Sequence, residues 1–281
     1  MKAVTTIAEL RAAVAEARSA GDRVSFVPTM GALHEGHLAL VDVAQRFGGF
    51  VVMSIFVNPL QFGPNEDLAR YPRDLHADAE RAAARGTSLV FAPSVDELYR
   101  RERFVEIRPL TIADAWEGAS RPGHFAGVLT VVAKLFNIVQ PDFAVFGQKD
   151  LQQAALVQAM ARELDFPLEV IVAPTVRDTD GLALSSRNAF LSVGERRVAL
   201  ALPRALTKLR AAHRSGVRSG AELERVAEEV LLAEPGIELD YLAVVDRRTF
   251  KRVKTTGDHA AAIAAIRVGA TRLIDNELLD P

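Results

Sequence analysis

Residues 24–41 have the sequence VSFVPTMGALHEGHLALV, and this stretch decides the predicted fold. An apolar run ends at Pro28, a turn containing Gly31 follows, and apolar residues at helical spacing begin near His37. The pattern predicts a buried strand, a turn and the start of a helix, which is a building unit of open parallel sheets. At such a helix start, unpaired N–H groups and the positive end of the helix dipole favour binding of a phosphate group.

Two histidines, His34 and His37, stand in this turn on either side of Gly36. At this spacing they are expected on one face of a solvent-facing helical turn, where both imidazoles can donate hydrogen bonds to one polyphosphate. Gly36 leaves room for the ligand to approach. A metal-ligand pair and two unrelated surface histidines remain alternatives. A P-loop is excluded because His37 and Leu38 replace its Lys and Ser/Thr, and no G-x-G-x-x-G motif follows a candidate strand.

The composition of the 281 residues is that of an ordinary globular protein, with 49% hydrophobic and 25% charged residues. The net charge of -2 is spread along the chain, so no nucleic-acid partner is expected. The absence of cysteine excludes disulfides, thiolate catalysis and cysteine-ligated metal sites. No signal sequence and no apolar run of the roughly 20 residues that span a bilayer is found. We therefore expect no membrane partner and a cytoplasmic location.

Apolar runs separated by helical patterns predict a parallel sheet with helices on both faces. Its strands include residues 24–27, 50–57 and 143–146, and the weak alternation of Phe104 to Ile107 predicts an edge strand. The polar run of residues 175–188 predicts a hinge followed by a mobile basic loop. Beyond it, a smaller α/β unit is expected, which includes one helix over residues 195–213.

Further candidate side chains come directly after these strands. Because open sheets bind ligands beyond the carboxyl ends of their strands, Gln61, Lys149 and Gln153 are candidate contacts. Gln61 can also be a solvated loop amide, and His124 can be a helix-terminal histidine bonded to backbone or part of the same site. Imidazoles, a lysine and a Ser-Ser-Arg loop suit a nucleoside triphosphate attacked at its α-phosphorus. No acidic cluster stands out as a ligand for Mg²⁺, so this ion is expected to arrive with the nucleotide and water.

Motifs along nearly the whole chain resemble those of one family. His34-x-Gly36-His37 resembles the His-x-Gly-His signature of the nucleotidyltransferase superfamily, and residues 184–187 resemble a variant of its Lys-Met-Ser-Lys-Ser loop. In order, the chain contains PTMGALHEGH, SIFVNPLQF, ARYPR, EGASRPGHF, FGQKD, GLALSSRN and RLIDN. This set resembles the pantothenate synthetase family. The segment of residues 99–103 departs from the family pattern, in which it is longer.

The resemblance implies a fold and a reaction. It implies a Rossmann-like parallel sheet domain over residues 1–175, a smaller C-terminal α/β lid domain over residues 176–281, and a homodimer. The implied reaction joins pantoate to β-alanine through a pantoyl adenylate, with ATP cleaved to AMP and pyrophosphate.

The resemblance also assigns site residues. The implied catalytic residues are His37, with an acid role, and His34, Lys149 and Arg187. The implied ATP contacts are Met30, Gly31, Ala32, Leu33, His34, Glu35, Gly36, His37, Gly147, Gln148, Lys149, Asp150, Val176, Leu184, Ser185, Ser186 and Arg187. Gln61 and Gln153 are the implied pantoate contacts, and Gln61 also lies at the β-alanine position.

The two glutamines fit this chemistry. A carboxylate that must attack phosphorus loses reactivity in a tight salt bridge, whereas glutamine amides hold it by neutral hydrogen bonds. Two other functions remain alternatives. An adenylyltransferase of the same superfamily would keep the nucleotide on its product, and a nucleotide-binding regulatory module would not turn over.

Overall fold

The computed structural model describes residues 2–64, 66–99 and 102–280. The chain divides into two compact units, which we call the sheet unit (residues 1–147 and 156–174) and the C-terminal unit (residues 148–155 and 175–281). Residues 148–155 therefore group with the C-terminal unit, ahead of the limit of 175/176 expected for the domains. That domain limit remains a prediction.

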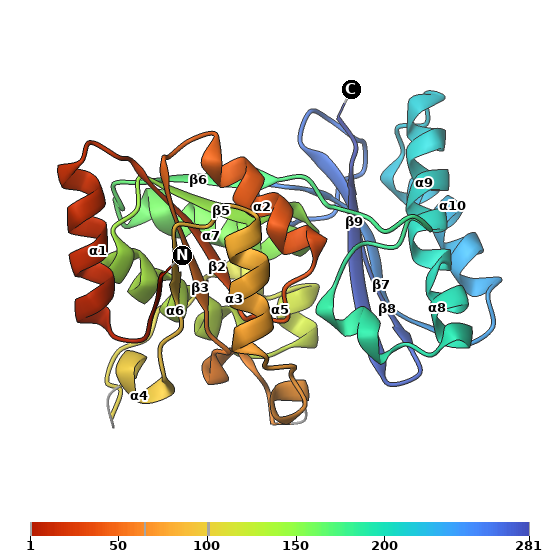
Figure 1. The fold of residues 1–281 in the computed structure, drawn as a ribbon. Helices are drawn as coiled ribbons and strands as arrows, with labels where there is room; N and C mark the ends of the chain where they lie inside the picture. Colours follow the sequence, from red (N-terminus) through yellow and green to blue (C-terminus); the bar gives the residue numbers. More distant parts are fainter. Residues whose placement is uncertain (1, 65, 100–101, 281) are drawn as a thin grey trace. The chain divides into compact units, whose positions relative to one another are not determined.

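The sheet unit contains six parallel strands in the order β1-β4-β3-β2-β5-β6. The strands are β1 (Lys2–Val4), β2 (Val24–Thr29), β3 (Phe50–Ile55), β4 (Leu89–Phe91), β5 (Phe143–Gly147) and β6 (Glu169–Ala173). Strands and helices alternate along the chain (Figure 1). The helices are α1 (Ile7–Ser19), α2 (Glu35–Gln45), α3 (Leu75–Ala84), α4 (Val95–Leu98), α5 (Glu117–Ser120), α6 (His124–Val139) and α7 (Leu151–Glu163), of which residues 151–155 of α7 group with the C-terminal unit.

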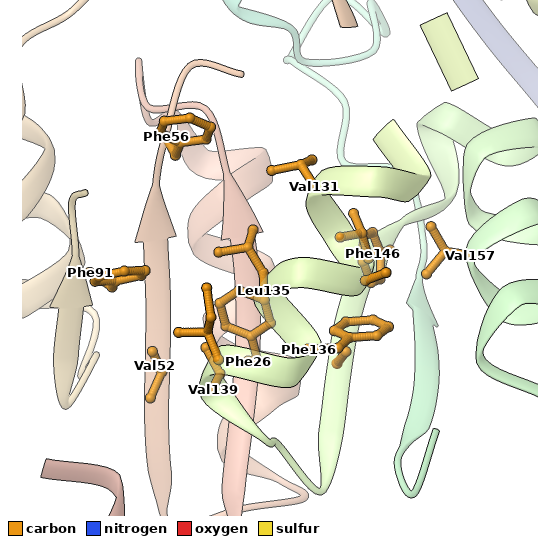
Figure 2. Packing of buried hydrophobic residues seen from close by; sticks show 14 of the residues in the cluster. Phe26, Val52, Phe56, Phe91, Val131, Leu135, Phe136, Val139, Phe146 and Val157 are labelled. Carbon is orange, nitrogen blue, oxygen red and sulfur yellow. The ribbon is translucent and has the colours of Figure 1, made fainter. Parts of the chain in front are cut away.

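Both faces of this sheet are covered, which is why its strands are continuously apolar. Because side chains alternate across a strand, Phe26 belongs to one hydrophobic cluster and its neighbour Val27 to another. The first cluster packs against α1, α6 and α7, and the second against α2 and α3. Figure 2 shows Leu135 and Val139 of α6 lying near Phe26 of β2, and Phe136 of α6 near Phe146 of β5.

The strand order reverses direction at β2, because the chain continues to β3 on one side of it and later returns to β5 on the other. The crevice outside the carboxyl ends of two such strands is the usual ligand site of an open sheet. The turn after β2 and Gly147 at the end of β5 lie at this point. The expected parallel α/β fold is confirmed.

The C-terminal unit contains an antiparallel sheet of three strands, β7 (Ile237–Asp246), β8 (Ala260–Val268) and β9 (Thr271–Leu278). Its helices are α8 (Val193–Ala199), α9 (Ala201–Arg214) and α10 (Gly220–Leu232). Leu206 and Leu209 of α9 and Leu223 of α10 belong to one buried cluster with the strands. This unit thus has a hydrophobic core of its own.

Two expectations for secondary structure were wrong. The helix expected over residues 195–213 is divided into α8 and α9, because Pro203 lacks an N–H and its ring would clash with the carbonyl of Ala199 in a continuous helix. The edge strand expected from Phe104 to Ile107 joins neither sheet in the described part of the chain. Of the segment of residues 99–103, residues 100 and 101 lie outside the described residues.

Candidate active site

The turn after β2 is held in place by α3. The backbone N–H groups of Ala32 and Leu33 each donate to a different oxygen of the Asp78 carboxylate, both at 2.8 Å. Arg81, one helical turn further along α3, donates to the carbonyl oxygen of Leu33. Asp78 is only 4% exposed, so these bonds lie away from solvent. Side chains of a neighbouring helix therefore fix the backbone of the expected nucleotide-binding turn.

Gly31 is required by this arrangement. Its φ of 82° lies in the left-handed region, and Ala32 follows with a φ of 50°. A Cβ atom at Gly31 would lie 2.8 Å from an Asp78 carboxylate oxygen and 3.1 Å from a methyl group of Ile55. Any larger residue would push Asp78 away from the turn.

His34 and His37 form a stacked pair at the start of α2, with ring centroids 4.1 Å apart. His34 is the N-cap of α2, and its Nδ1 accepts the N–H of Gly36 at 3.1 Å. Nδ1 of His37 accepts the N–H of His34 at 3.4 Å. Because an acceptor nitrogen carries no proton, the neutral form of each ring has its proton on Nε2. Two imidazole donors therefore stand side by side at the positive end of the helix dipole.

This geometry corrects the expectation that both histidines occupy a solvent-facing turn. Both are half-buried, and His34 satisfies a backbone donor that would otherwise lack a partner in the helix. The expectation that they share one face is confirmed by the stacking of their rings. His34 thus caps the N-terminus of α2 in addition to its expected role in phosphate binding.

The Gln61 amide is buried and has a fixed orientation. Its Oε1 accepts Nδ2 of Asn58 at 3.0 Å, and its Nε2 donates to Sδ of Met30 at 3.1 Å. Asn58 is itself held, because its Oδ1 accepts the hydroxyl of Tyr99 at 2.8 Å and its Nδ2 also donates to the carbonyl of Gly127 at 3.1 Å. Gln61 is therefore a positioned amide that touches the turn after β2. Its alternative interpretation as a solvated loop amide is wrong.

The backbone of Gln61 is held by His124 at the start of α6 and by Arg121, which directly follows α5. Its carbonyl oxygen accepts Nδ1 of His124 at 2.8 Å and Nη2 of Arg121 at 3.3 Å. Arg121 also contacts Nε2 of His124 at 3.0 Å and forms ion pairs with Glu66 at 2.7 Å and Glu117 at 3.3 Å. These groups form one largely buried polar network that holds the backbone of Gln61, the expected pantoate contact.

The network determines the protonation of its members. A carbonyl oxygen only accepts and a guanidinium only donates, so His124 carries its proton on Nδ1 and none on Nε2. Burial, followed by the nearby charge of Arg121, lowers the pKa of His124 from 6.5 to about 4. Burial acts to raise the pKa of Glu66, but hydrogen bonding and the charge of Arg121 outweigh it and hold that pKa below its ordinary value. The structure thus favours the interpretation of His124 as a helix-terminal histidine that is hydrogen-bonded to the backbone.

The remaining predicted residues belong to the C-terminal unit. Lys149 lies in a short 3₁₀ helix, Gln148–Asp150, directly after β5. Nδ2 of Asn276 on β9 donates to the carbonyl oxygens of Gln148 and Lys149 at 2.9 and 3.0 Å, and Oδ1 of Asn276 accepts Nε2 of Gln148 at 3.1 Å. The buried Asn276 therefore fixes the backbone that carries Lys149.

The segment of residues 176–188 is fastened within the same unit. Arg177 forms a bidentate ion pair with the buried Asp275, with distances of 2.6 and 3.0 Å. The N–H of Leu184 donates to the carbonyl of Val176 at 3.0 Å, and Asn188 Nδ2 donates to the carbonyl of Ala183 at 3.1 Å. These bonds bring Val176 and Leu184 together and link the Ser185–Arg187 stretch to them. Hydrogen bonds and an ion pair therefore hold this segment within the C-terminal unit.

The predicted residues thus form two groups. The sheet unit holds Met30 to His37, Gln61 and Gly147, while the C-terminal unit holds Gln148 to Asp150, Gln153, Val176 and Leu184 to Arg187. Sequence reasoning missed the supporting residues Asn58, Asp78, Arg121 and Asn276. A detectable signal for Asp78 was an acidic residue on the buried face of α3, four positions before the buried Ala82.

Two features are absent from the described part of the chain. In residues 2–64, 66–99 and 102–280, no three His, Asp or Glu side chains are grouped so that they could hold a metal ion. Across the same residues, no helix combines the length and the apolar composition that crossing a membrane requires.

Comparison with known proteins decides the family. The family model described as pantoate-beta-alanine ligase matches residues 2–278. The chain belongs to the pantoate-β-alanine ligase family. Pantothenate synthetase of Moorella thermoacetica is 51% identical over 282 residues, which cover 100% of this chain and 99% of that protein. The enzyme of Rubrobacter xylanophilus is 53% identical over 272 residues, which cover 93% of each.

Solved structures of pantoate-β-alanine ligases agree. Pantothenate synthetase of Thermus thermophilus matches with a TM-score of 0.95 and 49% identity, covering 100% of both chains. The ligase of Francisella tularensis, complexed with beta-gamma ATP and β-alanine, matches with a TM-score of 0.79 and 33% identity over 99% of this chain and 98% of that one. The predictions of a pantothenate-forming ligase and of its family are confirmed.

Proposed function

We propose that this chain condenses pantoate with β-alanine through a pantoyl adenylate, and that the residues described above perform the two half-reactions. The observation that carries the proposal is the 3.1 Å contact between Gln61 Nε2 and Met30 Sδ. This contact joins the amide expected to hold pantoate to the turn that bears the stacked histidines. A carboxylate held by Gln61 would therefore stand beside a nucleotide bound to that turn.

In the first half-reaction, a carboxylate oxygen of pantoate attacks the α-phosphorus of ATP. A new P–O bond forms, the bond to the bridging oxygen breaks, and pyrophosphate leaves with the electron pair. The Nε2–H groups of His34 and His37, together with the Lys149 ammonium, would donate to the oxygens on which negative charge increases. Ser185, Ser186 and Arg187 would contact the phosphates from the C-terminal unit.

In the second half-reaction, the neutral amine of β-alanine attacks the acyl carbon of the adenylate. The C–N bond forms, the C–O bond to AMP breaks, and the nitrogen loses a proton. Gln61 and Gln153 would hold the pantoyl group by neutral hydrogen bonds, with Gln61 also contacting β-alanine. We propose that the C-terminal unit acts as a lid that excludes water, which would hydrolyse the mixed anhydride.

Magnesium is proposed to enter as part of the substrate MgATP, coordinated by phosphate oxygens and water. We further propose that the enzyme is a cytoplasmic homodimer, as the family resemblance implies. ATP, pantoate and β-alanine are its proposed small-molecule partners.

Isotope exchange tests the reaction sequence. Labelled pyrophosphate should exchange into ATP when pantoate and Mg²⁺ are present and β-alanine is absent, and AMP release should wait for β-alanine. Exchange that requires β-alanine, or rapid AMP release without it, would contradict the adenylate mechanism. An adenylyltransferase would instead release an adenylated product, and a regulatory module would show no exchange.

A further inference from the structure

Strand β9 carries two consecutive polar residues that are buried, Asp275 and Asn276. Asp275 is 3% exposed and Asn276 2% exposed. Burial of a carboxylate or an amide costs free energy unless hydrogen bonds or an ion pair replace the lost water. The two side chains are therefore kept in the strand by what they bind, and their partners indicate what they do.

The two residues lie on opposite faces of the small antiparallel sheet, because successive side chains of a strand alternate. Asp275 stands opposite Ala264 of β8, and Ala264 belongs to the hydrophobic cluster that packs against α9 and α10. Asn276 stands opposite Ile263, which is not a member of that cluster. Asp275 is therefore on the face that the helices cover, and Asn276 is on the other face.

The amide of Asn276 binds one short stretch with both of its ends. Its Nδ2 donates to the carbonyl oxygens of Gln148 and Lys149 at 2.9 and 3.0 Å, and its Oδ1 accepts Nε2 of Gln148 at 3.1 Å. A carboxylate of the same size has no proton to donate, and an apolar side chain neither donates nor accepts. The position therefore requires an amide, and the amide determines the path of residues 148 and 149.

The carboxylate of Asp275 holds a different stretch. Its two oxygens accept the guanidinium of Arg177 at 2.6 and 3.0 Å, and one of them also accepts the backbone N–H of Asn276 at 2.8 Å. Arg177 pairs by an antiparallel β-bridge with Ala183, which stands two positions before the stretch of residues 185–187. Asp275 therefore fixes the base of the segment that carries Ser185 to Arg187.

We propose that Asp275 and Asn276 are positioning residues for adenylation, which set Lys149 and the stretch of residues 185–187 in a fixed arrangement relative to each other. Strand β9 lies against both 3₁₀ helices that carry these groups, Gln148–Asp150 and Ser186–Phe190. The cationic and hydroxyl donors would then meet the triphosphate as one preorganised set, which needs no rearrangement when charge develops. This inference rests on the proposed function, and neither side chain is proposed to touch ATP.

Asn276→Asp tests the inference with a side chain of the same size, whose carboxylate oxygens would face two carbonyl oxygens. It should raise the Kd for ATP, measured by calorimetry without pantoate, and lower the rate of pyrophosphate exchange, each about tenfold or more. The KM for β-alanine should change less than about twofold. Asn137→Asp, the same change at an exposed position of α6, is the matched control and should behave like the unchanged protein.

Arg177→Lys is a second, milder variant. It keeps the positive charge beside Asp275 but loses the bidentate geometry, so the fold should be retained while ATP binding weakens in the same direction. Circular dichroism and thermal unfolding of each variant separate a displaced site from an unfolded chain. Unchanged ATP affinity in folded Asn276→Asp and Arg177→Lys would overturn the proposal.

Double-mutant cycles test whether the positioning residues act through the groups that they hold. In a Lys149→Ala background, Asn276→Asp should lower pyrophosphate exchange by less than about threefold further, and Arg177→Lys should do the same in an Arg187→Ala background. Losses that multiply in full, or a KM for β-alanine that rises as much as the KM for ATP, would overturn the proposal. Absence of pantoate-dependent exchange in the unchanged protein would refute the proposed function instead, and the ATP affinities would still decide the positioning.

Discussion

The carboxylate of Asp78 accepts the backbone N–H of Ala32 at 2.8 Å, although 46 residues separate the two in the chain. Its other oxygen accepts the N–H of Leu33 at the same distance, so one buried side chain determines the path of the turn that carries the proposed nucleotide site. Asp78 does not need to touch a ligand to affect catalysis.

Asp78→Asn should therefore lower both stability and activity. An amide NH₂ would face a backbone N–H, and the unmade hydrogen bond in a buried site costs about 1–3 kcal/mol. The displaced turn should raise KM for ATP more than KM for β-alanine. Glu80→Gln on the exposed face of the same helix is the control and should behave like the unchanged protein. Equal effects of the two substitutions on KM for ATP would argue against a positioning role.

The two histidines should respond differently to substitution. His34→Ala removes the N-cap of α2 and should cost about 0.5–2 kcal/mol of stability, whereas His37→Ala should cost less. Both should lower kcat/KM by about 10² or more if each donates to charge that develops in the transition state.

His34→Asn separates the two tasks of this residue. Asparagine is a good N-cap but has no Nε2–H at the imidazole position, so thermal stability should recover while kcat/KM stays low. Thermal unfolding and steady-state kinetics on the same preparations provide the comparison. Recovery of activity together with stability would mean that His34 acts through the helix alone.

Lys149→Ala should slow the adenylation step by about 10² or more with little loss of stability, because the side chain is half-buried and its backbone remains bonded to Asn276. The rate of pyrophosphate exchange measures this step directly. Lys251→Ala, at an exposed position in the C-terminal unit, is the control. Normal exchange with slow amide formation would move Lys149 to the second half-reaction.

Acidification should destabilise the protein through His124. Its pKa is 6.5 in the unfolded chain and about 4 in the folded one, so between these values only the unfolded chain gains the proton. The contribution of His124 to the free energy of unfolding is therefore fully present above about pH 6.5. It is lost as the pH decreases towards 4, and the loss is on the order of 3 kcal/mol. His124→Gln can keep a donor to the Gln61 carbonyl and an acceptor for Arg121 but does not titrate. The difference in unfolding free energy between about pH 7.5 and about pH 5 should be smaller in this variant, and an equal difference would refute the assignment.

Movement of the proposed lid should occur at the junctions between the units rather than inside residues 176–188, because Arg177 and Asn188 fasten that segment within the C-terminal unit. Spin labels on cysteines introduced at Thr179 and Arg214, both in that unit, should keep their separation when ATP binds. Labels at Glu16 and Arg214, one in each unit, should change theirs. The reverse result would indicate a loop that moves by itself.

Local patterns were sufficient to predict the order of strands and helices and the residues that lie just beyond strand ends. The run of residues 24–41 combines a continuous apolar strand with a glycine turn and a helix start, and each of these is decided by neighbours in sequence. The division between α8 and α9 could also have been predicted from the sequence, because Pro203 stands within the apolar pattern that indicated one helix.

What could not be predicted depends on contacts between distant residues. Three sets of hydrogen bonds form only once the tertiary fold is in place. They join Asn58 to Gln61 and Tyr99, Asp78 to the turn after β2, and Asn276 to the backbone of residues 148 and 149. The RLIDN motif could be recognised in the sequence, but the structural role of its Asn276 could not be predicted, because nothing near it in sequence indicates that it binds residues 148 and 149.

The hold of Asn276 on the carbonyl oxygens of Gln148 and Lys149 also has a consequence for synthesis on the ribosome. The sheet unit has all of its strands once residue 173 has emerged, and it can begin to fold while the rest is still being translated. The backbone that presents Lys149 has to wait for a partner translated more than a hundred residues later. A nascent chain can thus possess the complete parallel sheet and still lack an ordered lysine, so that competence to bind the triphosphate would come only after residue 276 has been translated and has folded.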